Sequence, residues 1–185
     1  MCLQVLAVDK RFSEVRPRHP RGGKDGGRDI EAKYQNVHST FGAVGFVNQA
    51  NDSAEQKTQI FTKFAEDLAS ALSADPKPHV FVFFTNLSLT VGEKKKLVGK
   101  AMKKGLLYCD VFDRERLRIV LDGPDGFYIR FQYLGLSLSE AEQASFFARW
   151  GTDLQSVIST GFQSVHRSLE RMLFLQEAER VLHGL

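Results

Sequence analysis

A continuous apolar run over residues 79–84, His-Val-Phe-Val-Phe-Phe, constrains the fold more than any other stretch of this chain. Its length and its bounding turn signals favour a strand that is covered on both faces. A helix is predicted to follow, ending at Lys104, because Thr90 and Glu93 have the spacing of a capping box. Residues 106–111 then form another strand, and the short connections make these elements a parallel crossover. The sequence therefore predicts an α/β fold.

Further elements are predicted upstream of this crossover. In chain order they are a short helix within residues 3–12, a strand over 28–35, a turn over 37–42, an antiparallel strand over 43–49, and a helix capped by Asp52 or Ser53. Pro17 and Pro20 are expected to end regular structure before the first strand. The capped helix carries an apolar stripe at three-to-four spacing from Ile60 to Leu72.

Downstream, the pattern predicts a short helix, one more strand and then helices to the end of the chain. Residues 113–121 form the short helix, and the alternation over residues 127–134 predicts the strand. Ser139 begins the helical part, whose apolar residues at 154, 158, 162, 165, 169 and 172 follow steps of four and three. We therefore expect one domain over residues 1–135. A helical extension over residues 136–185 would pack on it, form a homo-oligomer or lead to further domains.

Composition argues against a disulfide-rich, zinc-binding or membrane-spanning protein. Cys2 and Cys109 are the only cysteines, too few for a disulfide framework or a zinc site, and they favour a cytoplasmic protein. No stretch reaches the roughly 18 uninterrupted apolar residues of a membrane span, so no membrane partner is expected. The net charge of +3 does not by itself indicate nucleic-acid binding. The lysines between residues 94 and 104 are either a solvated helix face or a nucleic-acid contact.

The candidate functional residues lie between Gly22 and Asn51. Four glycines and alternating charges lead to Asp29, at the start of a strand whose period of two puts Asp29, Glu31 and Lys33 on one face. Carboxylates on a strand beside the hydrophobic centre indicate a metal site or a paired cation.

The loop before this strand is rich in basic residues. Those beside the glycines are Arg21, Lys24 and Arg28. Glycine amides and guanidinium groups both suit phosphate, so the loop is either a phosphate contact or a solvated surface loop. The glycines do not form a Walker loop, because no Gly-Lys-Ser/Thr closes them.

The turn Asp25-Gly26-Gly27-Arg28-Asp29-Ile30 and the order of elements over residues 3–121 resemble the PD-(D/E)XK, restriction-endonuclease-like superfamily, within its Mrr-like branch. The resemblance implies a mixed β-sheet flanked by helices, and hydrolysis of DNA phosphodiester bonds with Mg²⁺ or Mn²⁺. It also implies that Asp29 binds the metal and that Gln49 is the second ligand. A family lysine two residues further on positions or activates the attacking water.

Asn51 stands where the family has that lysine, and Gln4 stands nearest to the family's first-helix glutamate. Lys33 could supply the missing cation and Glu31 a second carboxylate, or both could lie on a solvated face. With Arg21, Lys24 and Arg28, Asn51 would contact DNA.

Three hypotheses follow from these residues. The first is a metal-dependent DNA endonuclease with Asp29, Gln49, Glu31 and Lys33 as catalytic residues. The second is a catalytically inactive module of the nuclease fold that binds DNA or assembles. The third is a sensor or effector module at the front of a larger defence or regulatory protein.

Overall fold

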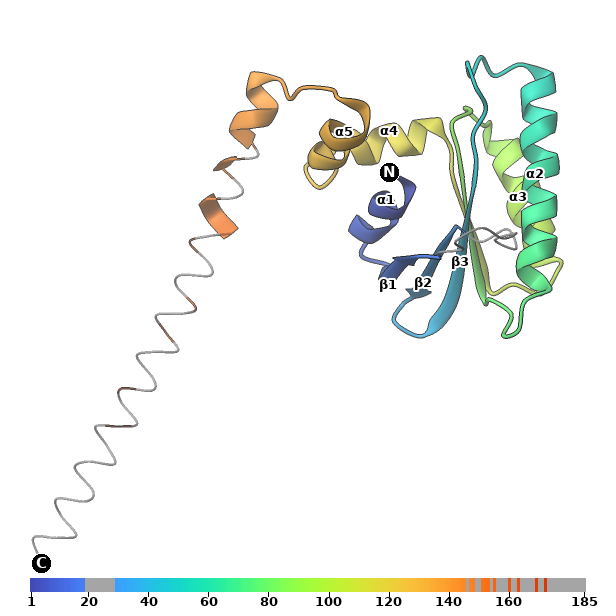
Figure 1. Cartoon of the computed structure of the whole chain (residues 1–185), viewed down its shortest axis with the longest axis horizontal. Helices are drawn as coiled ribbons and strands as arrows, with labels where there is room; N and C mark the ends of the chain where they lie inside the picture. Colours follow the sequence, from blue (N-terminus) through green and yellow to red (C-terminus); the bar gives the residue numbers. More distant parts are fainter. Residues whose placement is uncertain are drawn as a thin grey trace, which may run out of the picture. The chain divides into compact units, whose positions relative to one another are not determined.

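The computed structural model describes residues 1–18, 29–145, 147–148, 151–153, 155, 160, 163, 169 and 172. The chain divides into two compact units, residues 1–136 and residues 137–185. The first unit has the predicted α/β architecture, a five-stranded mixed sheet flanked by helices (Figure 1). Its elements are α1 (Cys2–Val8), β1 (Phe12–Pro17), β2 (Ile30–Tyr34), β3 (His38–Gly45), α2 (Ala54–Leu72), β4 (Val80–Thr85), α3 (Val91–Met102), β5 (Tyr108–Phe112), α4 (Arg114–Asp122) and α5 (Phe127–Leu134).

The strands lie in the order β1-β2-β3-β4-β5. β1 pairs with β2 and β2 with β3 in antiparallel fashion, whereas β3, β4 and β5 are parallel to one another. β2 alone therefore runs against the other strands. Its first residue lies at the edge of the sheet where β3, β4 and β5 end.

The alternating side chains of β4 build two hydrophobic layers, and every residue of this strand is buried. Phe81 and Phe83 pack against α2 and α3 on one face. Val82 and Phe84 pack against α1 and α4 on the other face. The prediction that residues 79–84 form a strand covered on both faces is confirmed.

Side-chain caps begin the two helices of one face as predicted. The Ser53 hydroxyl accepts a hydrogen bond from the Gln56 amide at the start of α2. At the start of α3, Thr90 accepts from the Glu93 amide, and the Glu93 carboxylate accepts from the Thr90 amide. This reciprocal capping box satisfies donors that a helix start otherwise leaves unpaired.

The predicted boundaries of the β2–β3 hairpin are wrong. The chain turns at residues 35–37, where Gln35 and Asn36 have positive φ angles of 51° and 61°, and β3 already begins at His38. Such left-handed residues are typical of tight hairpin turns. β1 was not predicted; it follows the short helix α1, which ends at Val8.

The predicted strand over residues 127–134 is wrong, because these residues form the helix α5. Gly126 lies so close to α4 that a Cβ on it would be 1.9 Å from the Val120 carbonyl oxygen. This close approach turns the chain sharply from α4 into α5, and Arg130 of α5 forms an ion pair with Asp122 of α4. α5 thus packs on α4 instead of extending the sheet.

In the second unit, the predicted cap at Ser139 is confirmed. The Ser139 hydroxyl accepts from the Glu142 amide at 3.3 Å, and the Glu142 carboxylate accepts from the Ser139 amide at 2.8 Å. The described residues from 140 to 172 are helical.

Of the predicted apolar row, residues 154, 158, 162 and 165 lie outside the described residues. No helix in the described part of the chain is both long enough and apolar enough to cross a membrane.

Candidate site at the Asp29 edge of the sheet

Asp29 lies at the edge where β2 begins and the parallel strands end. Its amide donates to the Gly42 carbonyl oxygen at 2.8 Å, and its carboxylate Oδ2 accepts from the Val44 amide at 2.7 Å. Its carbonyl oxygen accepts from the Arg18 amide at 3.2 Å. In open α/β sheets, ligands bind outside the carboxyl ends of the strands. Backbone contacts on both sides therefore hold Asp29 at an edge suited to a site.

The Asp29 carboxylate is coupled electrostatically to the Cys2 thiol of α1. Burial raises the pKa of the Cys2 thiol to about 11; the N-terminal ammonium opposes this rise and the charge of Asp29 adds to it. Cys2 packs with Ile30 on the α1 face of the sheet. Because side chains alternate along β2, Glu31 and Lys33 project from the other face. Glu31 and Lys33 therefore share one face of β2, and Asp29 directly precedes this strand.

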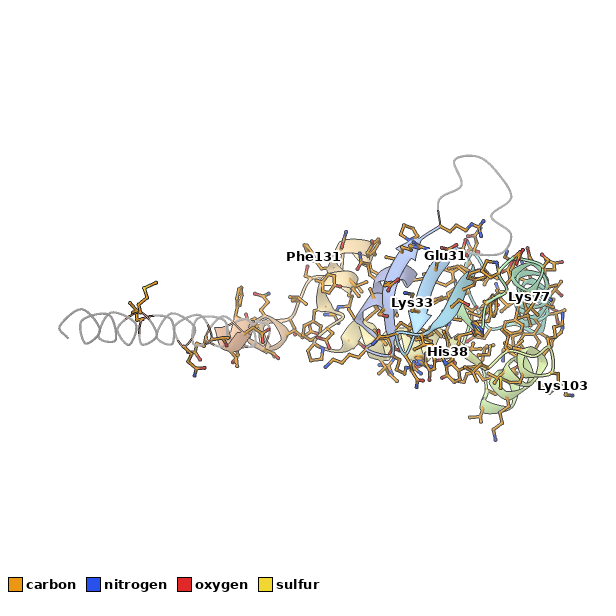
Figure 2. The ribbon with its side chains drawn as sticks, turned by 90° about the horizontal axis from the view of Figure 1, so that it is seen from below. Glu31, Lys33, His38, Lys77, Lys103 and Phe131 are labelled. Carbon is orange, nitrogen blue, oxygen red and sulfur yellow. The ribbon has the colours of Figure 1, made fainter. Side chains whose placement is uncertain are left out.

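Glu31 and Lys33, both labelled in Figure 2, form ion pairs with β1 and the residue after it. The Glu31 carboxylate lies 3.0 Å from Arg16 Nη2 and 3.8 Å from Arg18 Nη1, and Lys33 Nζ lies 2.7 Å from Glu14 Oε1. Glu14 has a φ of 49° and lies in a bulge of β1, a distortion that redirects side chains. These residues line a groove of about 450 Å³, whose lining has three acidic and three basic side chains.

β3 ends at Gly45, so Gln49 does not lie on the strand that pairs with β2. A Cβ on Gly45 would lie 2.6 Å from Phe83 Cζ, which makes glycine the residue that fits there. Two residues after Gly45, both backbone groups of Val47 are hydrogen-bonded to the Asn86 side chain. Asn86 Oδ1 accepts from the Val47 amide at 2.9 Å, and Asn86 Nδ2 donates to the Val47 carbonyl oxygen at 2.7 Å. At Val47, the Asn86 side chain thus takes the place of a neighbouring strand as hydrogen-bond partner, and the chain leaves the sheet after β3.

Gln49 and Asn51 belong to the loop that leads into α2. Gln49 is exposed, has a φ of 48°, and its carbonyl oxygen accepts from Gln56 Nε2 at 3.3 Å. The Asn51 Oδ1 accepts from the Ser53 amide at 3.1 Å, and the Asn51 amide donates to Gln56 Oε1 at 2.9 Å. The Asn51 side chain therefore stabilises the turn before α2, a local role typical of asparagine. The other predicted DNA contacts, Arg21, Lys24 and Arg28, lie outside the described residues.

Among the described residues, the side chains next to Asp29 on β3 do not supply the second ligand of a Mg²⁺ or Mn²⁺ site of the expected kind. These ions favour oxygen ligands, and Mg²⁺ requires near-octahedral geometry. The stretch of β3 beside Asp29 consists of Gly42, Ala43 and Val44, whose side chains offer no oxygen. Among the described residues, no three His, Cys, Asp or Glu side chains form a group that could hold a metal ion.

Two ion pairs near the ends of β4 and β5 were not predicted. The Asp52 carboxylate accepts from the Ser88 amide at 2.9 Å and pairs with Arg114. Asp113 is 1% exposed, and its carboxylate lies 2.9 Å from Lys94 Nζ. No local signal could have revealed these pairs, because the partners lie far apart in the sequence. They link Asp52 in the loop before α2 to α4, and Asp113 at the start of α4 to α3.

In comparisons with known proteins, no family model, no curated protein and no solved structure matches this chain.

Proposed function

We propose that residues 1–136 are a restriction-endonuclease-like domain that binds DNA and does not hydrolyse it. The ancestry is supported by the order of elements: a first helix, an Asp-bearing hairpin, a helix, a buried strand, a second helix and a parallel strand. The mixed sheet with helices on both faces also agrees with the resemblance of the sequence.

The environment of Asp29 supports the proposal that the domain does not hydrolyse DNA. The carboxylate accepts a hydrogen bond from the Val44 amide, and the adjacent stretch of β3 has no carboxylate or amide side chain. A metal ion at Asp29 would therefore lack the second protein ligand that the family supplies from this strand. Asp29 then acts as a structural acceptor that fixes the start of β2 against β3.

The cation expected beside the scissile phosphate is also engaged elsewhere. Lys33 forms its ion pair with Glu14, and Asn51 uses its amide oxygen in the turn before α2. Neither residue is arranged to stabilise the charge that develops on a phosphate during hydrolysis. Asn51→Lys alone is therefore expected to create no activity.

The test combines a cleavage assay with a binding assay on the full chain. Supercoiled plasmid is incubated with the protein in Mg²⁺ or Mn²⁺, and a fluorescent DNA duplex is titrated by anisotropy at low salt. We expect no nicking and saturable binding. Nicking by the wild type that Asp29→Asn abolishes would overturn the non-hydrolytic half. Absence of any DNA binding would overturn the other half.

A metal-dependent endonuclease is the second candidate, and the placement of Asp29 favours it. Asp29 lies at the edge where three parallel strands end, the usual position of ligands in such sheets. Under this hypothesis, Asp29→Asn removes plasmid nicking while the circular dichroism spectrum and the unfolding midpoint stay close to wild type. The same variant therefore distinguishes the two candidates.

A further inference from the structure

Five of the six basic side chains of α3 and of the turn that closes it differ from most others in the described part of the chain, because they form no ion pair with a described residue. The described arginines all form ion pairs, and so do Lys33, Lys57, Lys63 and, on α3 itself, Lys94. Apart from Lys10 and Lys77, the described basic residues that form no ion pair with a described residue are Lys95, Lys96, Lys100, Lys103 and Lys104. All five are exposed.

These five lysines, here called the α3 lysines, lie on the helix and in the turn that closes it. Leu97 and Ala101 point into the core. Lys95 and Lys96 point away from it, Lys100 lies at the flank beside α2, and Lys103, labelled in Figure 2, follows the end of the helix with Lys104. Lys96 and Lys100 are four residues apart, about 6 Å along the helix axis. One DNA strand rises about 3.4 Å per nucleotide, so this step spans roughly two phosphates.

Stability of the helix does not account for the α3 lysines as a group. Cations near the C-terminal end of a helix are stabilised by the helix dipole. This effect can account for Lys100, Lys103 and Lys104, which lie at that end of α3. Lys95 and Lys96 lie nearer the helix start, where this gain is absent. Neighbouring like charges on a helix also repel one another by a few tenths of a kcal/mol per pair.

Gly99 leaves room at the middle of this surface. It lies between Lys95 and Lys103 along one row of the helix, and a Cβ on it would meet nothing within 4 Å. A glycine inside a helix costs about 1 kcal/mol relative to alanine. The site has no crowding that would require glycine, and its bare backbone lets a partner approach closely.

We propose that the α3 lysines bind the phosphate backbone of duplex DNA, as a surface separate from the Asp29 edge. The inference rests on the proposed function for the choice of DNA as the polyanion. Binding of this kind reads no base sequence and releases counterions, so its affinity falls steeply as salt rises.

The test compares two double variants of the full chain with equal charge change. Lys100→Gln with Lys104→Gln alters the α3 lysines, and Lys10→Gln with Lys77→Gln alters exposed lysines that likewise have no ion pair. Duplex binding is measured by anisotropy between 50 and 200 mM salt. We expect the first variant to lose about tenfold or more in affinity and about 1.8 in the slope of log K against log salt, since each phosphate contact contributes roughly 0.9. The control variant should lose much less, and Lys100→Arg with Lys104→Arg should bind like wild type.

Each alternative outcome has a distinct meaning. Equal losses in both Gln variants, or no loss in either, would overturn the α3 surface and leave DNA binding and the proposed function standing. A wild-type chain that binds no duplex would overturn the proposed function and this inference together. A wild type that binds duplex RNA more tightly than duplex DNA, with loss of RNA binding in the first variant, would overturn the assignment of DNA as the partner.

Discussion

Asn86 holds both backbone groups of Val47, through its Oδ1 at 2.9 Å and its Nδ2 at 2.7 Å. The pair connects the residue after β4 to the chain just beyond β3, 39 residues earlier. It therefore sets where the loop containing Gln49 and Asn51 starts.

Asn86→Ala should destabilise the domain by about 2 to 3 kcal/mol, because it leaves the Val47 amide and carbonyl without their partner. Val47 is buried, so water does not readily replace the lost hydrogen bonds. Urea unfolding followed by circular dichroism measures the change. Asn48→Ala is the matched control: Asn48 is exposed, and its replacement should change the free energy of unfolding by less than about 0.5 kcal/mol. Equal effects of the two variants would contradict the role of Asn86.

Gly45→Ala should destabilise the domain by about 1 to 3 kcal/mol, as overpacking of a core typically does. The new Cβ would lie 2.6 Å from Phe83 Cζ and 3.3 Å from Ile60 Cδ1. Gly99→Ala should instead stabilise it by up to about 1 kcal/mol, because that position is open and helical. Thermal melts of both variants test the contrast, and a Gly45→Ala protein as stable as wild type would refute the packing argument.

Asp9 should contribute to stability in a pH-dependent way. Burial alone would raise the pKa of the Asp9 carboxyl, but hydrogen bonds from Arg11 outweigh burial and hold the pKa below its ordinary value of 3.8. A carboxyl whose pKa is lowered in the folded state stabilises above its unfolded pKa, and this contribution is lost as pH falls through the folded pKa. Asp9→Asn should therefore reduce the free energy of unfolding at pH 7 and flatten its decline below about pH 4.

Urea titrations at pH 7, 5, 4 and 3 provide the measurement. The control is Asp9→Asn in an Arg11→Gln background, where the partner that lowers the Asp9 pKa is absent. The two effects of Asp9→Asn should shrink in that background. An undiminished effect there would show that Arg11 is not the cause.

Both cysteines should react slowly with iodoacetamide while the protein is folded. Burial raises the pKa of the Cys2 thiol to about 11 and that of Cys109 to about 12, from 9.0. At pH 8 the reactive thiolate of Cys2 is then about 100-fold scarcer than in an exposed thiol, before any steric protection. Mass spectrometry should find both residues alkylated rapidly in denaturant and barely at all without it. Rapid labelling of the native protein at Cys2 would contradict its packing on the sheet.

The sequence predicted those parts of the fold that depend on local patterns. The buried run at residues 79–84, the Thr90 capping box and the parallel crossover are all confirmed, because apolar continuity and cap spacing act over a few residues. Residues 127–134 alternate like a strand but form α5, because the close contact of Gly126 with α4 overrides the local pattern.

The candidate site depended on contacts that sequence spacing does not encode. The Asp29 carboxylate accepts from the backbone amide of Val44, and a backbone group has no signature in the sequence. The partner of Lys33 is Glu14, which a bulge in an unpredicted strand brings opposite it. Asp29 was predicted at the start of a strand and directly precedes β2, while the contacts of Asp29, Glu31 and Lys33 became known only from the structure.

The distortion of β1 has a consequence for how copies of this domain meet. An edge strand with regular, unpaired amides invites a neighbouring chain to extend the sheet, which leads to aggregation. β1 carries a bulge, the left-handed residue Glu14 and, at its end, Pro17, which has no amide hydrogen to donate. Each of these features disfavours the addition of a further strand along β1.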